Sequence, residues 1–519
     1  MNTQLKNRYA SAVLLLCGVL SVTAAELRLP TLFSDHMVLQ RNQPVPVWGW
    51  AEPGAEVEVG FKGRNYAARA DAEGRWEVRM GPFEADSTPQ VLVVRLRDGS
   101  AAHSISNVLV GEVWLCSGQS NMAWPLRGTD NGRAVSALAD HPEIRLFEVA
   151  FRSSPVPDED VPGQWTPCTP ESAATFPATA FYFARQLREQ LGVPIGLLGS
   201  YKGGSPAMPW APLETLRGHP EFERPVRRVE STTVEELEAA YTAAHARWAQ
   251  RREEQPDEDP PLREPVHWSR NDRFPTGLYN AMIAPLVPYA IAGVIWYQGE
   301  TDTNHGSDVY RTLFDALIRG WRKAWGREDL PFLYVQLANY RKRSAEPEFT
   351  TWDILREAQR NTLELPHTAM AVAIDIGSEG IHPGNKKDVG ERLALAARHV
   401  VYGHDIVHSG PQFREMKVER NRVYLDFDHV GSGLVLMPPP TERDGSTPER
   451  ALGFAVAGDD QVFHWAEAMV EQDRVAVWSD AVKRPIAVRY GWGINPAVNL
   501  YNREGLPAIP FRTDTWPMK

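Results

Sequence analysis

Cysteine is scarce in this chain, with 3 residues among 519. Cys17 lies in an N-terminal apolar stretch with the layout of a cleaved leader, so Cys116 and Cys168 would remain in the mature chain. A lipoprotein modification at Cys17 is disfavoured, because the bulky Leu16 stands where a small residue is expected. Two thiols allow at most one disulfide and disfavour a cysteine-based metal site. The sequence leaves open whether the two residues meet.

Long basic runs and membrane-length apolar runs are also missing. The formal net charge is -11, which argues against a nucleic-acid partner because phosphates demand a basic surface. The apolar residues 10–22 are too short to span a membrane; Lys6 and Arg8 precede them and small residues follow. We therefore predict a signal peptide at residues 1–25, a secreted or periplasmic protein without a membrane span, and a neutral or small polar substrate.

The chain does contain clear changes of pattern. Residues 26–107 show short alternating strands separated by turns, which predict an N-terminal β module. Residues 108–404 alternate near-continuous apolar runs with helical patterns, which predict an α/β domain with a parallel sheet covered on both faces. A helical insertion at about 214–270 interrupts this domain, and residues 405–519 return to strands as a C-terminal β region. Whether the two β regions form one module or two stays open.

The stretch "CSGQSNM" places a serine at a predicted functional edge. Ser120 follows the apolar run "VLVGEVWL", and the carboxyl end of a strand in an open α/β sheet is where ligands usually bind. Ser120 is thus either a nucleophile or the polar cap of a helix. Met122 stands where the Gly-x-Ser-x-Gly elbow requires glycine, which disfavours the usual α/β-hydrolase fold.

Three further polar stretches, "GGSP", "WYQGET" and "EGIHPGNK", follow other predicted strands. His382 is able to take the proton of Ser120 and return it to a leaving alcohol. The N–H groups of Ser120 and Gly203 and the amide of Gln298 are candidate donors to an oxyanion, worth about 3 to 4 kcal/mol per donor. Each has a structural alternative, since His-Pro often precedes a helix and paired glycines often form a tight turn.

A glycosidase pair is a weaker interpretation of the third stretch. Glu300 and Asp302 are two residues apart in sequence, so they need not face each other across a sugar. No histidine, cysteine or carboxylate cluster has metal-ligand spacing. We therefore expect neither a metal nor another cofactor.

Taken together, these stretches resemble a known family. "CSGQSNM", "GVPIGLLGSYKGGSP", "LYNAMIAPL", "WYQGET" and "IHPGNKKDVGERLA" are similar to the sialate O-acetylesterase family, carbohydrate esterases of the SGNH hydrolase superfamily. The resemblance extends to "LFSDHMVLQRNQPVPVWGWAEPG" near the start and "NLYNREGLPAIPFRTDTW" near the end, so it covers nearly the whole mature chain. It implies an SGNH (flavodoxin-like) three-layer α/β/α esterase domain with flanking β-sandwich modules.

The resemblance also implies roles for individual residues. Ser120 becomes the nucleophile and His382 the base, while Ser120, Gly203 and Gln298 form the oxyanion hole. The neighbouring motif residues are expected to contact the substrate: Gln119, Asn121 and Glu300.

Two positions depart from the family's pattern. Lys202 stands before the paired glycines where tryptophan is common. Gly380 stands where the family carries an aspartate two residues before the catalytic histidine. Glu379 is the nearest acid and keeps the superfamily's three-residue spacing to His382, so it is the predicted triad acid. A carboxylate elsewhere, such as Asp375, or a Ser–His dyad oriented by a backbone carbonyl or water, stays open.

The resulting prediction is a secreted carbohydrate O-acetylesterase that forms an acetyl-enzyme. Its substrate would be an O-acetylated sialic acid or an acetylated plant polysaccharide such as xylan or xyloglucan. The alternative is a noncatalytic carbohydrate-binding protein on the same fold, but the presence of Ser120, His382 and Gln298 together argues against it.

Overall fold

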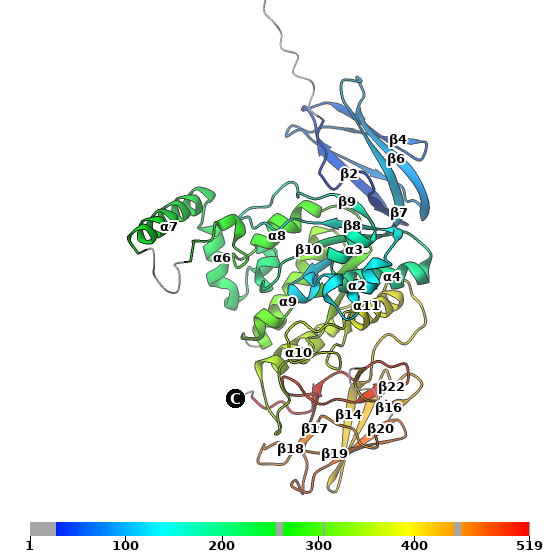
Figure 1. Ribbon diagram of the computed structural model, residues 1–519, viewed down its shortest axis with the longest axis vertical. Coiled ribbons are helices and arrows are strands. Elements are labelled where there is room, and N and C mark those ends of the chain that lie inside the picture. The colour runs from blue at the N-terminus through cyan, green and yellow to red at the C-terminus, as the bar shows by residue number, and fades with distance from the viewer. Residues whose placement is uncertain (1–26, 256–262, 305–306, 441–447, 518–519) are drawn as a thin grey trace, which may run out of the picture.

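The computed structural model describes residues 27–255, 263–304, 307–440 and 448–517, so the expected signal peptide lies outside it. N-terminal strands, a central layer of helices and strands, and C-terminal strands follow one another along the long axis (Figure 1). No helix in the described ranges is long and apolar enough to cross a membrane. The mixed α/β class expected from the sequence is confirmed.

The N-terminal strands share their longest member with the central sheet. They are β1 (Val38–Gln40), β2 (Val45–Trp50), β3 (Glu56–Phe61), β4 (Arg64–Arg69), β5 (Arg75–Met80), β6 (Asp86–Leu96) and β7 (Ala102–Gly118). The first part of β7 pairs antiparallel with β6, and the last part pairs with β10 (Ile195–Tyr201) and β11 (Gly293–Tyr297). The domain boundary expected at residue 108 therefore falls inside one continuous strand.

The central sheet has the order β13-β12-β11-β7-β10-β8-β9. Its remaining strands are β8 (His141–Glu148), β9 (Trp165–Cys168), β12 (Phe332–Val335) and β13 (Thr368–Ala371). Neighbours in this order are parallel except β8 and β9, so the sheet is mixed through one edge strand. Strands β8, β9 and β10 lie on one side of β7, and strands β11, β12 and β13 lie on the other side. Such a switch point, at the carboxyl ends of the strands, is where α/β sheets bind ligands.

Successive side chains of β7 enter two different cores, because side chains alternate across a strand. Trp114 and Cys116 join a buried cluster with α4 (Ala178–Leu191) and α11 (Lys387–Val400). Val113 and Leu115 join a second cluster with α8 (Gly277–Met282), α9 (Ser307–Ala324) and α10 (Thr351–Asn361). Helices thus cover both faces of the sheet (Figure 1).

The two cysteines lie in the same core and remain separate. Cys116 and Cys168 are both buried and unpaired. Burial raises the pKa of the Cys168 thiol to about 12, so it stays protonated at neutral pH. Both residues therefore act as small apolar side chains.

The expected insertion is helical and largely solvated. It contains α5 (Leu213–Leu216), α6 (Glu223–Glu230) and α7 (Val234–Glu254), and α7 has no buried residue along its length. A capping box at Thr233 and Glu236 fixes the start of α7. The helix extends to one side of the molecule (Figure 1). Three shorter helices lie near the serine or at the sheet edge: α1 (Ser120–Ala123), α2 (Gly132–Ala137) and α3 (Pro170–Thr175).

The C-terminal region contains two antiparallel four-stranded sheets and a strand pair. The first sheet has the order β14-β15-β20-β19, with β14 (Gln412–Glu419), β15 (Arg422–Asp428), β20 (Arg474–Trp478) and β19 (Glu467–Glu471). The second has the order β18-β17-β21-β23, with β18 (His464–Trp465), β17 (Phe454–Ala457), β21 (Ala487–Tyr490) and β23 (Phe511–Arg512). β16 (Leu434–Leu436) pairs with β22 (Leu500–Asn502).

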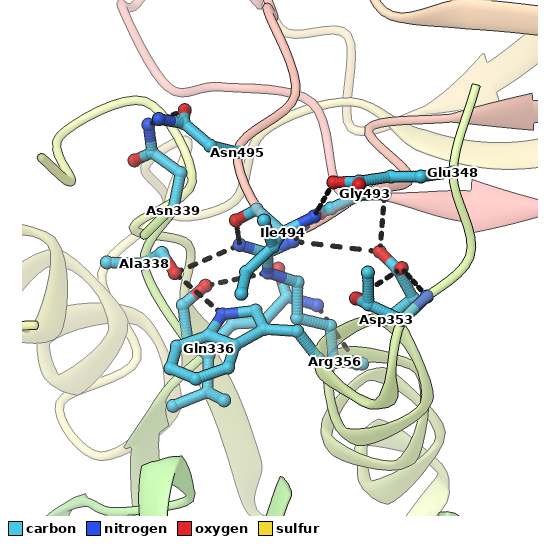
Figure 2. Close-up of polar contacts among 12 residues, drawn as sticks. Gln336, Ala338, Asn339, Glu348, Asp353, Arg356, Gly493, Ile494 and Asn495 are labelled. Carbon is cyan, nitrogen blue, oxygen red and sulfur yellow. Dashed lines mark hydrogen bonds and ion pairs between the residues drawn. The ribbon is translucent and has the colours of Figure 1, made fainter. Parts of the chain in front are cut away.

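One buried arginine joins this C-terminal region to the central domain. Arg356 of α10 donates hydrogen bonds of 2.8 and 3.2 Å to the carbonyls of Gly493 and Ile494, in a loop after β21 (Figure 2). It also donates to the carbonyls of residues 337 and 338 of its own domain, both at 2.9 Å. One guanidinium group therefore holds backbone from both sides of the junction.

Candidate active site

A close approach of two strands sets the position of Ser120. Gly118, the last residue of β7, has φ 136°, and a Cβ there would lie 2.1 Å from the Tyr297 carbonyl oxygen. Only glycine fits such a contact at such a φ. The N–H of Gln119 then donates to the same Tyr297 oxygen at 2.9 Å, and Ser120 begins α1. Ser120 is half-buried and follows the carboxyl end of a sheet strand, as the sequence predicts, and the strand order places this end at the switch point.

The turn at Gly203 lies directly against Ser120. A Cβ added to Gly203 would lie 3.6 Å from the Cβ of Ser120. The N–H of Lys202 donates to the Gly118 carbonyl at 3.0 Å, which ties this turn to the end of β7. Within the described residues, the N–H groups of Ser120 and Gly203 have no hydrogen-bond acceptor. Both are therefore available to a ligand oxygen.

Gln298 is fully buried, and its amide is occupied by the protein. The amide nitrogen lies 3.2 Å from Gln119 Oε1 and 3.3 Å from the Ser205 carbonyl, and it donates to Asp302 Oδ2. The Tyr310 hydroxyl donates to Gln298 Oε1 at 3.0 Å. The structure thus directs this amide at protein acceptors, so a bond to an oxyanion would require it to give up one of them.

His382 lies on an aromatic platform that the sequence analysis did not identify. Its ring stacks on the indole of Trp124 with centroids 4.4 Å apart and planes 23° from parallel. Partial burial, and then the nearby Lys386, lower the pKa of His382, which keeps the ring neutral at neutral pH. A neutral imidazole is the form that acts as a general base. Neither the Ser120 hydroxyl nor another described side chain hydrogen-bonds the ring.

A buried network fixes the backbone on either side of His382. Asn121 Nδ2 donates to the Ile381 carbonyl at 3.0 Å, and Lys386 Nζ donates to the Pro383 carbonyl at 2.8 Å. Lys386 Nζ also donates to Asn121 Oδ1 at 2.6 Å. Asn121 directly follows Ser120, so its side-chain amide holds the turn at residues 118–121 to residues 377–383, which we call the histidine loop.

This network buries charge. Lys386 is 1% exposed, and burial lowers its pKa to about 7. Glu300 accepts from Asn121 Nδ2 through Oε1, while its Oε2 has no hydrogen-bond partner in the described part of the chain. Burial raises the pKa of Glu300 as well. Gln119, Asn121 and Glu300, expected to contact substrate, are thus buried and bonded to the protein.

The two acids near His382 in sequence lie in different surroundings. Glu379 is exposed, and its carboxylate makes no hydrogen bond to His382 or to any other described residue. Asp375 is buried and accepts two hydrogen bonds of 2.7 Å from Arg392, plus one of 3.1 Å from Tyr501. The expected contact between Glu379 and His382 is therefore not formed in this structure, and Asp375 is occupied by a structural ion pair.

Trp124 and Lys386 are the site residues that sequence reasoning missed. Lys386 belongs to "EGIHPGNK" and Trp124 lies two residues after "CSGQSNM", so their proximity in sequence to His382 and Ser120 was the available signal. Across the described ranges, no three histidine, cysteine or carboxylate side chains gather as metal ligands would.

Comparison with known proteins gives consistent matches. The profile of a carbohydrate esterase family, sialic acid-specific acetylesterase, matches residues 264–399. A sialate O-acetylesterase from Rattus norvegicus is 28% identical over 93% of this chain and 94% of its own length. The Homo sapiens protein of that name is 28% identical over 74% of this chain and 73% of its own. A solved carbohydrate acetylesterase from Xanthomonas citri is 41% identical, covers 95% of this chain and 100% of that chain, and has a TM-score of 0.79.

Proposed function

Because the chain belongs to the sialate O-acetylesterase family of carbohydrate esterases, and is therefore an ester hydrolase, we propose that it is a secreted enzyme releasing acetate from O-acetylated sugars. The observation that carries the mechanism is the meeting of Ser120, the Gly203 turn and the His382 loop at the switch point of the sheet. The domain carrying them is proposed to be an SGNH-type, flavodoxin-like unit.

The proposed reaction has two steps. Ser120 Oγ attacks the acetyl carbonyl while His382 takes its proton, and the N–H groups of Ser120 and Gly203 donate to the oxyanion. His382 then protonates the departing sugar alcohol, which leaves an acetyl group on Ser120. In the second step His382 removes a proton from water, which attacks the acetyl carbonyl. His382 then returns this proton to Ser120 Oγ as the bond from that oxygen to the acetyl carbon breaks, which releases acetate and restores the free serine. No step calls on a metal or a cofactor.

Gln298 and Glu379 are assigned roles that require a change on substrate binding. Gln298 is the proposed third oxyanion donor if one of its amide hydrogens exchanges its present acceptor for the substrate oxygen. Glu379 is the proposed acid behind His382, which its carboxylate reaches only if the exposed tip of the loop rearranges. Catalytic hydrogen bonds are often long or absent in enzymes without substrate, so the present geometry does not decide against either role.

The substrate class follows from the family and its chemistry. The relatives at 28% identity are sialate O-acetylesterases, whereas the solved protein at 41% identity is a carbohydrate acetylesterase. We propose acetyl esters of sialic acid or of plant polysaccharides such as xylan and xyloglucan as the substrates.

Acetate release tests the proposal. Wild-type protein and Ser120→Ala are incubated with acetylated sialic acid, xylan, xyloglucan and a neutral chromogenic acetate. We expect the wild type to release acetate from at least one sugar and Ser120→Ala to release none while keeping the same melting curve. Binding of an acetylated sugar by wild type without acetate release would instead indicate a noncatalytic binding protein, and near-wild-type turnover by Ser120→Ala would remove the nucleophile assignment.

A further inference from the structure

A loop of the C-terminal β region reaches the chain segment that leads to His382. This loop, residues 493–495, contacts residues 339–340 after β12, which in turn contact residues 377–378. We propose that the loop 493–495 positions the histidine loop through Asn339, so that esterase activity depends on the C-terminal region. The inference rests on the proposed catalytic role of His382.

The side-chain amide of Asn339 makes the direct link. Its Nδ2 donates to Asn495 Oδ1 at 2.7 Å, and its Oδ1 accepts from the N–H of Gly377 at 2.6 Å. Asn339 and Asn495 are 9% and 8% exposed, so water does not compete freely for either bond. Gly377 stands five residues before His382. One amide thus joins the C-terminal region to the start of the histidine loop.

A second link runs through the backbone. The Tyr340 N–H donates to the Ile494 carbonyl at 3.1 Å, and Tyr340 forms an isolated parallel bridge with Ser378. The contact at Gly377 is also close, since a Cβ there would lie 2.0 Å from Asn339 Oδ1. The start of the histidine loop therefore packs directly against residues 339–340, and no space separates the two segments at Gly377.

The loop 493–495 is itself held firmly. Arg356 binds the carbonyls of Gly493 and Ile494, while the N–H of Gly493 donates to Asp353 at 2.7 Å and that of Ile494 to Glu348 at 2.9 Å (Figure 2). Arg356 and Asp353 are each nearly inaccessible, with side chains 1% exposed. A support fixed by buried charged groups can set the position of the chain that rests on it.

The histidine loop needs such a support on its N-terminal side. On its C-terminal side, Asn121 and Lys386 already bind the carbonyls of Ile381 and Pro383. Between these two anchors, residues 378–380 are exposed. Loss of the Gly377 anchor would let the loop shift, and a 1 Å misplacement of a catalytic group costs up to about 100-fold in rate.

A double-mutant cycle tests the link. Asn339→Ala removes both bonds of the Asn339 amide. Asn495→Ala removes the C-terminal partner of Asn339 and also the hydrogen bond from Asn495 Nδ2 to the Arg341 carbonyl, so the double variant loses that one bond more than Asn339→Ala does. Glu357→Gln is the matched control, because it breaks the 2.7 Å ion pair between Glu357 and Arg512, another half-buried link between the same two regions. The readouts are kcat and KM on an acetyl ester, the melting temperature, and hydrogen exchange of residues 376–383.

We expect Asn339→Ala to lower kcat by about ten- to 100-fold with little change in KM. Asn495→Ala should lower kcat in the same way by a smaller factor. The double variant should stay close to Asn339→Ala, because Asn495 reaches Gly377 through Asn339, whereas its bond to the Arg341 carbonyl does not touch the histidine loop. Both single variants should speed hydrogen exchange in residues 376–383, whereas Glu357→Gln should change neither kcat nor this exchange.

The inference is wrong if Asn495→Ala leaves kcat and exchange of residues 376–383 at wild-type values, or if its effect on kcat simply multiplies that of Asn339→Ala. His382→Ala separates this result from the proposed function. If His382→Ala keeps activity, the catalytic assignment fails, while faster exchange in the asparagine variants would still show that the C-terminal region holds this loop.

Discussion

Replacing Lys386 by methionine should flatten the dependence of protein stability on alkaline pH. Burial lowers the pKa of Lys386 to about 7 in the folded protein, against 10.5 for a free lysine. Between these two values the unfolded chain holds a proton on Lys386 that the folded chain has released. Stability rises with pH wherever the unfolded state binds more protons, so the wild type should become more stable from pH 7 toward pH 10.

The size of the effect follows from the width of this window. Each pKa unit corresponds to 1.36 kcal/mol, so a group with a folded pKa near 7 adds roughly 3 kcal/mol to the free energy of unfolding between pH 7 and pH 10. Methionine fills a similar volume without a titrating group. Other groups that titrate in this range are shared by both proteins, and their contribution cancels when the two are compared.

Urea unfolding followed by tryptophan fluorescence at pH 7, 8, 9 and 10 measures the difference. The adjacent Lys387→Met is the control. It removes the same charge from a side chain that is 56% exposed and whose ion pair with Glu391 is long, at 3.8 Å. Its curve should run parallel to the wild type, while that of Lys386→Met should fall away from the wild type as pH rises. Parallel curves for Lys386→Met and wild type would refute a buried lysine with a depressed pKa.

Activity should change in the same variant for a separate reason. Loss of Lys386 leaves the Pro383 carbonyl and Asn121 Oδ1 without their donor, so the histidine loop loses one anchor and kcat should fall. Lys386 also lowers the pKa of His382, so its removal should raise that pKa and move the acid limb of the kcat/KM profile to higher pH. An acid limb that stays in place would show that Lys386 does not act on the base.

Four further outcomes are expected. Trp124→Ala should lower kcat up to about tenfold, since an aromatic pair is worth about 0.5 to 1.5 kcal/mol, and Trp124→Phe should recover most of it in the same assay. Glu379→Gln should lower kcat by several orders of magnitude at an unchanged melting temperature if this acid serves His382; a drop below about tenfold would leave a Ser–His dyad. Arg356→Met should cost about 3 to 5 kcal/mol in urea unfolding, because four carbonyls and Asp353 lose their buried cation. Exhaustive EDTA treatment should leave acetate release unchanged, and loss restored by one added metal would contradict the proposed chemistry.

The sequence predicted the place of Ser120 because that place depends on local pattern. An apolar run that ends in small and polar residues marks the end of a buried strand, and β7 has that form. The same strand hid the domain boundary. Among residues 102–107 only Ile105 is buried, whereas residues 108–118 are all buried, so the sequence pattern of this one strand resembles that of two separate elements.

Contacts between residues far apart in the chain could not be predicted from the sequence. Lysine is rarely buried, so nothing in "EGIHPGNK" indicated that Lys386 would bridge Asn121 and Pro383. The three-residue spacing of Glu379 and His382 likewise fixes no side-chain direction in an exposed loop. Apart from Asp302, four residues along the chain, the side-chain amide of Gln298 takes its partners from three other segments, at Gln119, Ser205 and Tyr310. Only the packed fold brings these segments together.

The continuity of β7 has a mechanical consequence. Its 17 residues run from the N-terminal β module to the turn before Ser120, and a β-bulge with Asn107 at φ 54° bends the strand where it passes between the two sheets. No linker separates the module from the central sheet, so the module and the turn before Ser120 are joined through one strand. Removing β6 while keeping all of β7 would uncover the backbone N–H and C=O groups along the first part of β7. The module and the central sheet therefore share a strand, and a cut at residue 108 would sever that strand within its paired length.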